Sequence, residues 1–286
     1  MIQHVVPVVE NVRLAERTFR VRVADAEIGR LVRPGQFVML RIPSITDPLL
    51  GRPFALYDTN LDAAGGVVGY DLVYLVVGKI TTLMSHLKAG DRVEIWGPLG
   101  NGFSLTPARH LMMVAGGIGQ TPFPAVARAY FGLRQFGVQQ SEKSDQQSAI
   151  HSPFTTLATL CYGARSAAFL AGIDDFRRIG VEVRVATDDG TAGHRGFVTD
   201  LVKQSLASDN PPTRLLGCGP EPMMHALAEI AATAGVPCEL SLETPMACGI
   251  GACFSCVAKI RQGGDRWDYR RVCVEGPVFD ASQVVF

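Results

Sequence analysis

Apolar and polar residues alternate in short stretches along the first third of the chain, as they do in half-buried strands. Turn residues such as Pro34-Gly35 and Gly97-Pro98 separate the stretches. Short strands with few helical patterns between them predict a small antiparallel barrel. The clearest helical segment, 82–87, is expected to cap one end of it. The predicted strands are 18–23, 37–42, 70–77 and 92–96.

The pattern changes near residue 105, where apolar runs begin to alternate with helical stretches. This alternation predicts a doubly wound parallel sheet, with the loops after its strands lining a ligand crevice. The expected strands are 110–115, 156–162, 181–186 and 214–217, and the expected helices are 123–136, a helix through 169 and 176, 197–206 and 223–234. The crevice loops are 116–121, 163–166, 187–190 and 218–222.

Past residue 236 the chain becomes rich in cysteine and glycine, and 257–261 with 270–273 reads as a hairpin around Gly263-Gly264. The fold class is therefore an α+β multidomain protein: an antiparallel barrel (1–104), an α/β domain (105–237) and a small C-terminal domain (238–286). The polar, Ser/Gln-rich stretch 137–152 is interpreted as a mobile surface insertion without assigned function.

Composition narrows the function classes. The length of 286 residues suits two domains with a small third, and 47% hydrophobic residues are enough for sizeable cores. A net charge of +0 and a pI near 7.0 give no electrostatic reason to expect nucleic acid or an anionic membrane as a partner. No run of about 18 apolar residues predicts a membrane span. The start of the chain lacks a secretory pattern, and we expect a cytoplasmic protein.

The cysteines carry the most specific chemistry. Cys248, Cys253 and Cys256 have C-x4-C-x2-C spacing, and Cys273 follows. This is the plant-type arrangement for a [2Fe–2S] cluster, in which one tight loop supplies three thiolates and a returning segment supplies the fourth. Two glycines between the first two cysteines let the backbone N–H groups turn toward the sulfurs. A structural zinc site is the alternative, although zinc usually takes paired cysteines at both ends.

Two segments of the first domain suit a phosphate-bearing ligand. Arg52, beside Pro53, is placed to bind a phosphate in a forked geometry, and nearby aromatic rings suit a flat ring. The turn before Thr81 offers backbone N–H groups at a helix start. A solvated arginine and simple helix capping remain open as alternatives.

In the second domain, Gly116-Gly117-Ile118-Gly119-Gln120-Thr121 follows a buried strand and precedes a helix. That geometry brings backbone close to a pyrophosphate, although the motif is not G-x-G-x-x-G and a tight structural turn is the alternative. Cys218-Gly219-Pro220 opens a later helix, and Cys218 on its own reads as a small buried residue.

Together these segments resemble the ferredoxin–NADP+ reductase superfamily. The resemblance implies a flavin-binding barrel, a nicotinamide-binding α/β domain, and Cys218 as the catalytic residue beside the nicotinamide. Ala55 stands where a hydroxyl residue is usual, and Ile80 where a second glycine is common. The residues implied for FAD are Arg52, Pro53, Phe54, Ala55, Val73, Tyr74, Leu75, Ile80 and Thr81, and those for NAD are Gly116, Gly117, Gly119, Thr121, Gly219 and Pro220.

The order of the domains, and the segments 187–200, 243–256 and 271–279, resemble the family of electron-transfer subunits of NAD-dependent dihydroorotate dehydrogenase (type 1B). That resemblance implies FAD, a [2Fe–2S] cluster held by Cys248, Cys253, Cys256 and Cys273, and electron transfer to NAD+ in pyrimidine biosynthesis. It also implies an FMN-containing catalytic partner, in a heterotetramer with two of each subunit. The alternatives are a flavin/NAD(P)H reductase subunit of another redox complex, such as a sulfhydrogenase, sulfide dehydrogenase or bifurcating enzyme, an independent ferredoxin reductase, or a zinc-binding module without redox chemistry.

Overall fold

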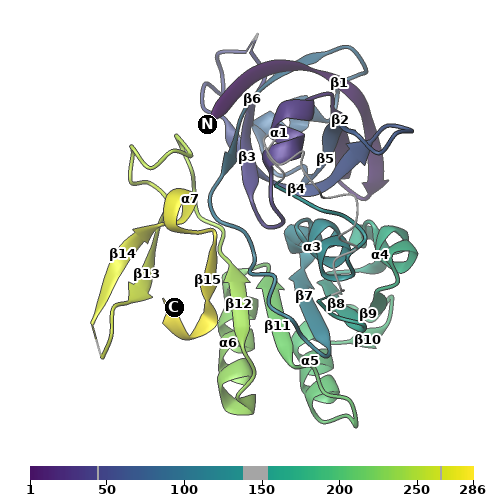
Figure 1. Cartoon of the computed structure of the whole chain (residues 1–286), viewed down its shortest axis with the longest axis vertical. Helices are drawn as coiled ribbons and strands as arrows, with labels where there is room; N and C mark the ends of the chain where they lie inside the picture. The colour runs from purple at the N-terminus through teal and green to yellow at the C-terminus, as the bar shows by residue number, and fades with distance from the viewer. Residues whose placement is uncertain (44, 138–153, 265) are drawn as a thin grey trace, which may run out of the picture.

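The structure, a computed structural model, describes residues 1–43, 45–137, 154–264 and 266–286. It consists of a barrel, a sheet flanked by helices, and a C-terminal segment that lies against both (Figure 1). The predicted insertion at 137–152 falls, apart from Gly137, outside the described residues.

Six strands form a closed antiparallel barrel, which confirms the predicted fold of the first part. β1 was not predicted as a strand: most of its residues are only half-buried, and its pairing with β2 shifts register twice. α2 begins three residues before the predicted helix at 82–87. The order around the barrel is β1 (Ile2–Ala15), β2 (Thr18–Val23), β5 (Val67–Leu75), β4 (Arg52–Leu61), β3 (Phe37–Arg41) and β6 (Arg92–Leu99), with short helices α1 (Ala26–Leu31) and α2 (Lys79–Met84).

The second part is a seven-stranded sheet, parallel except for the edge strand β15. The prediction of a doubly wound parallel sheet is confirmed. In order the strands are β10 (His194–Arg195), β9 (Glu182–Thr187), β8 (Ala158–Ala164), β7 (Leu111–Gly116), β11 (Arg214–Cys218), β12 (Cys238–Ser241) and β15 (Val278–Asp280).

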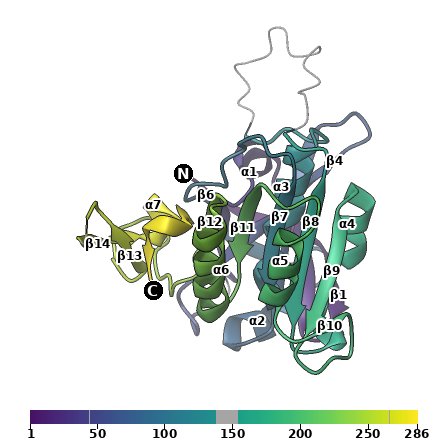
Figure 2. The same cartoon turned by 90° about the horizontal axis from the view of Figure 1, so that it is seen from below.

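Helices cover both faces of this sheet, because successive strand residues point to opposite faces. Met112 and Val114 of β7 pack in one core cluster with α5 (Val198–Leu206) and α6 (Glu221–Ala234). Met113 and Ala115 pack in another with α3 (Phe123–Tyr130) and α4 (Ile173–Ile179). Figure 2 shows α5 and α6 lying side by side along the sheet.

Two predicted helices differ from the observed ones. The helix predicted over 123–136 stops at Tyr130, and Gly132 follows with a φ of 68°, a conformation that a helix cannot continue through. The helix predicted through 169 and 176 is a short 3-10 turn, Ala167–Phe169, followed by α4, which Gly172 introduces with a φ of 72°.

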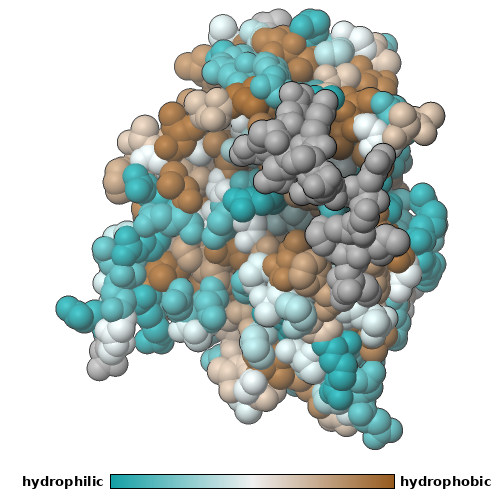
Figure 3. Space-filling view, in the orientation of Figure 1, coloured by the Kyte–Doolittle hydropathy of each residue, from teal (hydrophilic) through white to brown (hydrophobic). Residues whose placement is uncertain are grey.

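The C-terminal segment forms the predicted hairpin from β13 (Val257–Arg261) and β14 (Trp267–Arg271), with β16 (Val284–Val285) as a third strand. Cys273 lies in a one-turn helix, α7 (Val272–Glu275), rather than on the returning strand. The hairpin presents a mostly hydrophilic surface on the face seen in Figure 3. β12 and β15 belong to the seven-stranded sheet, so the sheet runs across the predicted division at 237/238.

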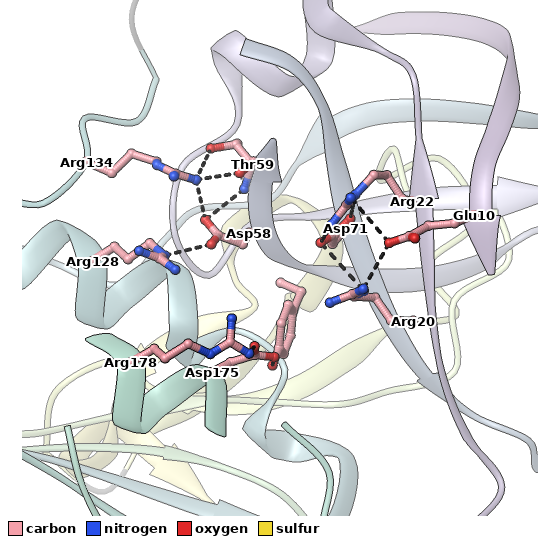
Figure 4. A network of polar contacts seen from close by, with 11 residues as sticks. Glu10, Arg20, Arg22, Asp58, Thr59, Asp71, Arg128, Arg134, Asp175 and Arg178 are labelled. Carbon is pink, nitrogen blue, oxygen red and sulfur yellow. Dashed lines mark hydrogen bonds and ion pairs between the residues drawn. The ribbon is translucent and has the colours of Figure 1, made fainter. Parts of the chain in front are cut away.

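Charged side chains join the barrel to the helical domain. Asp58 of β4 accepts hydrogen bonds from Arg128 Nε at 2.7 Å and from Arg134 Nη1 at 2.8 Å (Figure 4). Tyr57 donates to Asp175 Oδ2 of α4 at 2.6 Å. Among the described residues, no helix is both long and apolar enough to cross a membrane.

Candidate functional site

A cavity of about 620 Å³ lies where the barrel, the helical domain and the C-terminal segment meet. Ligand pockets of this size are typical for cofactors and drug-sized molecules. The barrel contributes β3, β4, β5 and the start of α2, and the sheet domain contributes Ile118, Thr121 and Cys218. The C-terminal segment closes the cavity with 241–246 and Pro277. One cavity therefore receives residues from all three parts of the chain.

All nine residues predicted for FAD line this cavity. The first four residues of strand β4 supply 52–55, the end of β5 supplies 73–75, and α2 supplies Ile80 and Thr81. The ring of Phe54 meets that of Tyr74 edge to face at 6.1 Å between centroids. The hydroxyl of Tyr74 donates to Asn11 Oδ1 at 3.1 Å, which holds the ring in place.

The side chains of Arg52 and Thr81 hydrogen-bond to main-chain groups that lie close to them in the sequence. The Arg52 guanidinium donates to the carbonyl oxygens of Leu50 and Gly51, at 3.0 and 2.9 Å. Thr81 Oγ1 accepts the N–H groups of Val77 and Gly78 at 3.0 and 3.1 Å. Those two donors of the predicted phosphate turn are thus bound within the turn, which fixes its shape.

The two predicted glycine turns of the sheet domain contact each other. A Cβ on Gly119 would lie 2.2 Å from the carbonyl oxygen of Cys218, and one on Gly219 would lie 2.8 Å from Gly116 N. Gly117 has a φ of 55°, which favours glycine. The carboxyl ends of β7 and β11 are neighbours in the sheet, so the turns after them meet at one edge. Of the residues in these turns, Ile118, Thr121 and Cys218 line the cavity.

Cys218 ends β11 and is only 4% exposed. Burial, followed by the nearby Glu243 carboxylate, raises the pKa of the Cys218 thiol well above its usual value. The thiol is therefore neutral at physiological pH, and neither a nucleophile nor a metal ligand in this state.

The sequence reasoning did not assign the segment 241–246 to the cofactor site, although it forms one wall of the cavity. Its most polar member is Glu243, whose exposed surface faces the cavity that it lines. Desolvation by the surrounding protein raises the pKa of the Glu243 carboxyl. No spacing rule marks this residue, and the available signal was its position directly after an apolar strand, next to the cysteine loop.

The cysteine loop brings the four predicted ligands together as two pairs. Hydrogen bonds from Ser255, and then from Cys248, lower the pKa of the Cys253 thiol to about 6. Burial, and then the neighbouring Cys256, raises the pKa of Cys273 to about 12. The Ile250 N–H group points to Cys248 Sγ at 3.4 Å, as expected for a loop whose amides face sulfur.

This pairing fits a two-iron cluster, because each of its irons takes two thiolates. A structural zinc ion instead needs its four ligands to converge tetrahedrally on one point. All seven cysteines are free thiols.

A closed antiparallel barrel and a doubly wound sheet that share a cavity define an oxidoreductase of the ferredoxin-reductase class. Residues 243–285 match the family model for the iron-sulfur cluster binding domain of dihydroorotate dehydrogenase B, and residues 113–229 match that for the oxidoreductase NAD-binding domain. The chain belongs to the family of electron transfer subunits of dihydroorotate dehydrogenase B (NAD(+)).

Two curated relatives, both electron transfer subunits of dihydroorotate dehydrogenase B (NAD(+)), illustrate the match. The one from Fusobacterium nucleatum subsp. nucleatum is 34% identical over 279 residues, which cover 96% of this chain and 95% of the relative. The one from Geobacillus thermodenitrificans is 36% identical over 281 residues, which cover 97% and 96%.

Solved structures agree on the fold. One, described in a study of flavin-based electron bifurcation by the NADH-dependent reduced ferredoxin-NADP oxidoreductase, has a TM-score of 0.78 and 26% identity, covering 99% of this chain and 90% of that chain. The cytochrome b5 reductase domain of Ulva prolifera nitrate reductase has a TM-score of 0.58 at 19% identity, covering 82% and 93%, and supports the fold alone.

Proposed function

We propose that this chain carries electrons from the FMN of a catalytic subunit, which oxidises dihydroorotate to orotate in pyrimidine biosynthesis, to NAD+. The observation that carries the proposal is the shared cavity, because the residues predicted for a flavin, the Cys218 turn and the segment leading to the cysteine loop all line it. The cytoplasm, a reducing compartment, suits a chain with seven free thiols.

Each of the three parts binds one cofactor. The barrel (1–104) holds FAD through 52–55, 73–75, Ile80 and Thr81. The α/β part (105–237) holds the nicotinamide dinucleotide on the turns at 116–121 and 218–220, with Cys218 beside the nicotinamide. The C-terminal part (238–286) holds a [2Fe–2S] cluster on Cys248, Cys253, Cys256 and Cys273. When bound, the flavin exchanges hydride with the nicotinamide and single electrons with the cluster.

The residues around Cys253 form the docking surface for the catalytic subunit. Ile250, Phe254 and Val274 are apolar yet 47%, 63% and 44% exposed; Ile250 and Phe254 share the loop of exposed Cys253 and partly buried Cys248, and Val274 lies against Gly251 of that loop. The Arg271 guanidinium lies 5.0 Å from the centre of the Phe254 ring and gives this surface a positive rim. A partner that covers these side chains brings its own redox centre close to the cluster. Two catalytic subunits and two of these chains complete the assembly.

The test is co-expression of this chain with the FMN-containing dihydroorotate dehydrogenase subunit. We expect the pair to co-purify and to reduce NAD+ with dihydroorotate, while neither subunit does so alone. Cys253→Ser should abolish this coupled activity but leave NADH oxidation by a two-electron acceptor intact. Cys161→Ala, at a buried cysteine outside the loop, is the matched control. Coupled turnover that persists in Cys253→Ser would refute the electron route.

A second function keeps the same site but changes the partner. The structural similarity to the NADH-dependent reduced ferredoxin-NADP oxidoreductase favours a subunit of a bifurcating complex. In that case the chain would not co-purify with the dihydroorotate dehydrogenase subunit and would give no dihydroorotate-dependent reduction of NAD+. The higher identity to dihydroorotate dehydrogenase B subunits, 34% and 36%, supports the first function.

A further inference from the structure

The side chain of Trp96 connects the barrel to the cysteine loop. Trp96 lies on β6, opposite Met39 of β3, and is half-buried. Its indole Nε1–H donates to the carbonyl oxygen of Cys248 at 3.1 Å. The loop before β13 accordingly runs beside the barrel strands β3 and β6 (Figure 1).

The outer ring of the same indole packs against Gly51, in the segment that leads into the cavity. A Cβ added to Gly51 would lie 2.5 Å from Trp96 Cη2 and 3.3 Å from Cζ2. Only a residue without a side chain admits the ring there. Gly51 immediately precedes Arg52, which lines the cavity. One side chain thus touches the start of the proposed flavin site and the first cysteine of the loop.

The next residue of the loop is also seated on the barrel. Gly249 has a φ of 73°, and a Cβ on it would lie 2.5 Å from Met39 Cγ and 3.2 Å from Leu99 Cδ1. Val38 and Leu40 belong to the barrel core, whereas Met39 points outward into the core shared with the C-terminal segment. The main chain at residues 248 and 249 therefore rests directly on the outer wall of the barrel.

The two cysteine pairs differ in how they are held. Cys256 and Cys273 are each 1% exposed, and Val272 N–H donates to the Cys256 carbonyl at 2.7 Å within the C-terminal segment. Cys248 is only partly buried and Cys253 is exposed. The inner pair is thus fixed by its own segment, while the outer pair depends on contacts made by Cys248 and its neighbours.

We propose that Trp96 is a positioning residue that seats Cys248 on the barrel and thereby fixes the outer pair of cluster ligands relative to the flavin cavity. The inference rests on the proposed function, because it assumes a cluster at these cysteines. Its mechanism is simple: the indole N–H fixes the Cys248 carbonyl, and the ring, held between Gly51 and the loop, fixes the indole.

The test compares Trp96→Phe with the wild-type chain. Phenylalanine keeps an aromatic ring at position 96 but removes the N–H donor, together with the outer ring atoms Cη2 and Cζ2 that contact Gly51. We expect iron to leave the folded holoprotein for a chelator about fivefold faster, as the loss of one hydrogen bond permits. We also expect an altered EPR spectrum of the reduced cluster, which a general loss of stability would not produce. Trp267→Phe is the matched control, since the chain has two tryptophans and Trp267 is 45% exposed on β14.

Gly51→Ala tests the same contact from the other side. It retains the indole N–H, yet its methyl group must displace the ring, so we expect the same change in iron release and EPR spectrum. Should Trp96→Phe fail to fold, this variant decides. Iron release and spectra identical to those of the wild type would overturn the role of Trp96. A wild-type chain that binds no iron would instead overturn the proposed function.

Discussion

Among the described residues, the contacts of the barrel with the helical domain and with the C-terminal segment differ in their polar groups. Toward the helical domain the polar contact is dominated by charged side chains, with Asp58 between Arg128 and Arg134 (Figure 4), beside one main-chain hydrogen bond from Glu16 N–H to the Ala168 carbonyl. Toward the C-terminal segment the barrel uses hydrogen bonds to the main chain of that segment: Asn101 N–H donates to the Gly276 carbonyl at 2.6 Å, and the Asn101 side chain accepts from Val278 N–H at 2.9 Å through Oδ1. Ion pairs between long side chains can re-form after a small shift, whereas hydrogen bonds to a buried main chain tolerate less displacement.

This difference matches the two tasks of the site. In the proposed function a nicotinamide enters and leaves beside the helical domain, and that contact should tolerate small movements. A cluster must stay at a fixed distance from the flavin, and that contact should be rigid. Burial raises the pKa of the Asp58 carboxyl despite its two arginines, so desolvation offsets the ionic attraction there. Three substitutions test this contrast.

Gly249→Ala should have the largest effect. Its methyl group would collide with Met39, and the residue is already in the left-handed region. Gly263 has a φ of 98° but has no atom within 4 Å of the added Cβ, so Gly263→Ala isolates the backbone strain. In urea unfolding we expect Gly249→Ala to cost about 2 kcal/mol more than Gly263→Ala. If the two substitutions lowered the free energy of unfolding equally, the cysteine loop would not be packed closely against the barrel at Gly249.

Asn101→Ala should have an intermediate effect. The Asn101 amide bonds to residues 275–278 through Val278 O at 2.8 Å and Val278 N at 2.9 Å, and its loss leaves these buried groups unpaired. We expect a loss of about 2 kcal/mol or slightly less in the free energy of unfolding. The exposed Asn210 provides a control, and Asn210→Ala should stay within about 0.5 kcal/mol of the wild type. A similarly small effect of Asn101→Ala would contradict the rigid contact.

Asp58→Asn should have the smallest effect, below about 1 kcal/mol at neutral pH, because desolvation offsets much of the ionic attraction of the carboxylate and the Asn carbonyl oxygen can still accept a hydrogen bond from an arginine. The raised pKa of Asp58 sets the sign of the pH dependence. The usual pKa of an Asp carboxyl is about 3.9. As the pH rises from there through the raised pKa of Asp58 in the folded chain, the wild type loses stability that Asp58→Asn keeps. Asp174→Asn, which removes a carboxylate whose side chain is 81% exposed, controls for the loss of a surface charge. If Asp58→Asn lowered the free energy of unfolding by more than about 2 kcal/mol, this contact would matter as much for stability as the contact made by Asn101, and the contrast would fail.

Strict patterns in the sequence were sufficient for much of the fold. The alternation at 18–23 gives β2 with its observed bounds, and the apolar run at 214–217 gives β11 to within one residue. β1 escaped prediction because a long curved strand with two register shifts loses the period of two. The helix expected to end at 136 ends at Tyr130, because Gly132 adopts the left-handed conformation and terminates the helix although the apolar periodicity continues.

The site was predicted where local chemistry marks it and missed where only packing does. Cys248 was identified by the spacing of its motif, and Arg52 by the family resemblance. Glu243 lies at the start of the segment 243–256, which resembles the family, but it was given no role, and Trp96 stands in no motif; the relevance of both comes from segments that meet only in the folded chain. Contacts of this kind depend on tertiary structure, which a pattern along the chain does not contain.

The most direct test of the central claim is anaerobic purification of the whole chain, followed by analysis of its iron, sulfide and flavin and a titration with NADH. The account predicts two irons, two sulfides and one FAD per chain, as a [2Fe–2S] flavoprotein requires. It also predicts that NADH bleaches the flavin absorbance and produces the EPR signal of the reduced cluster. A chain that holds zinc in place of iron, or that binds no flavin, would contradict the account.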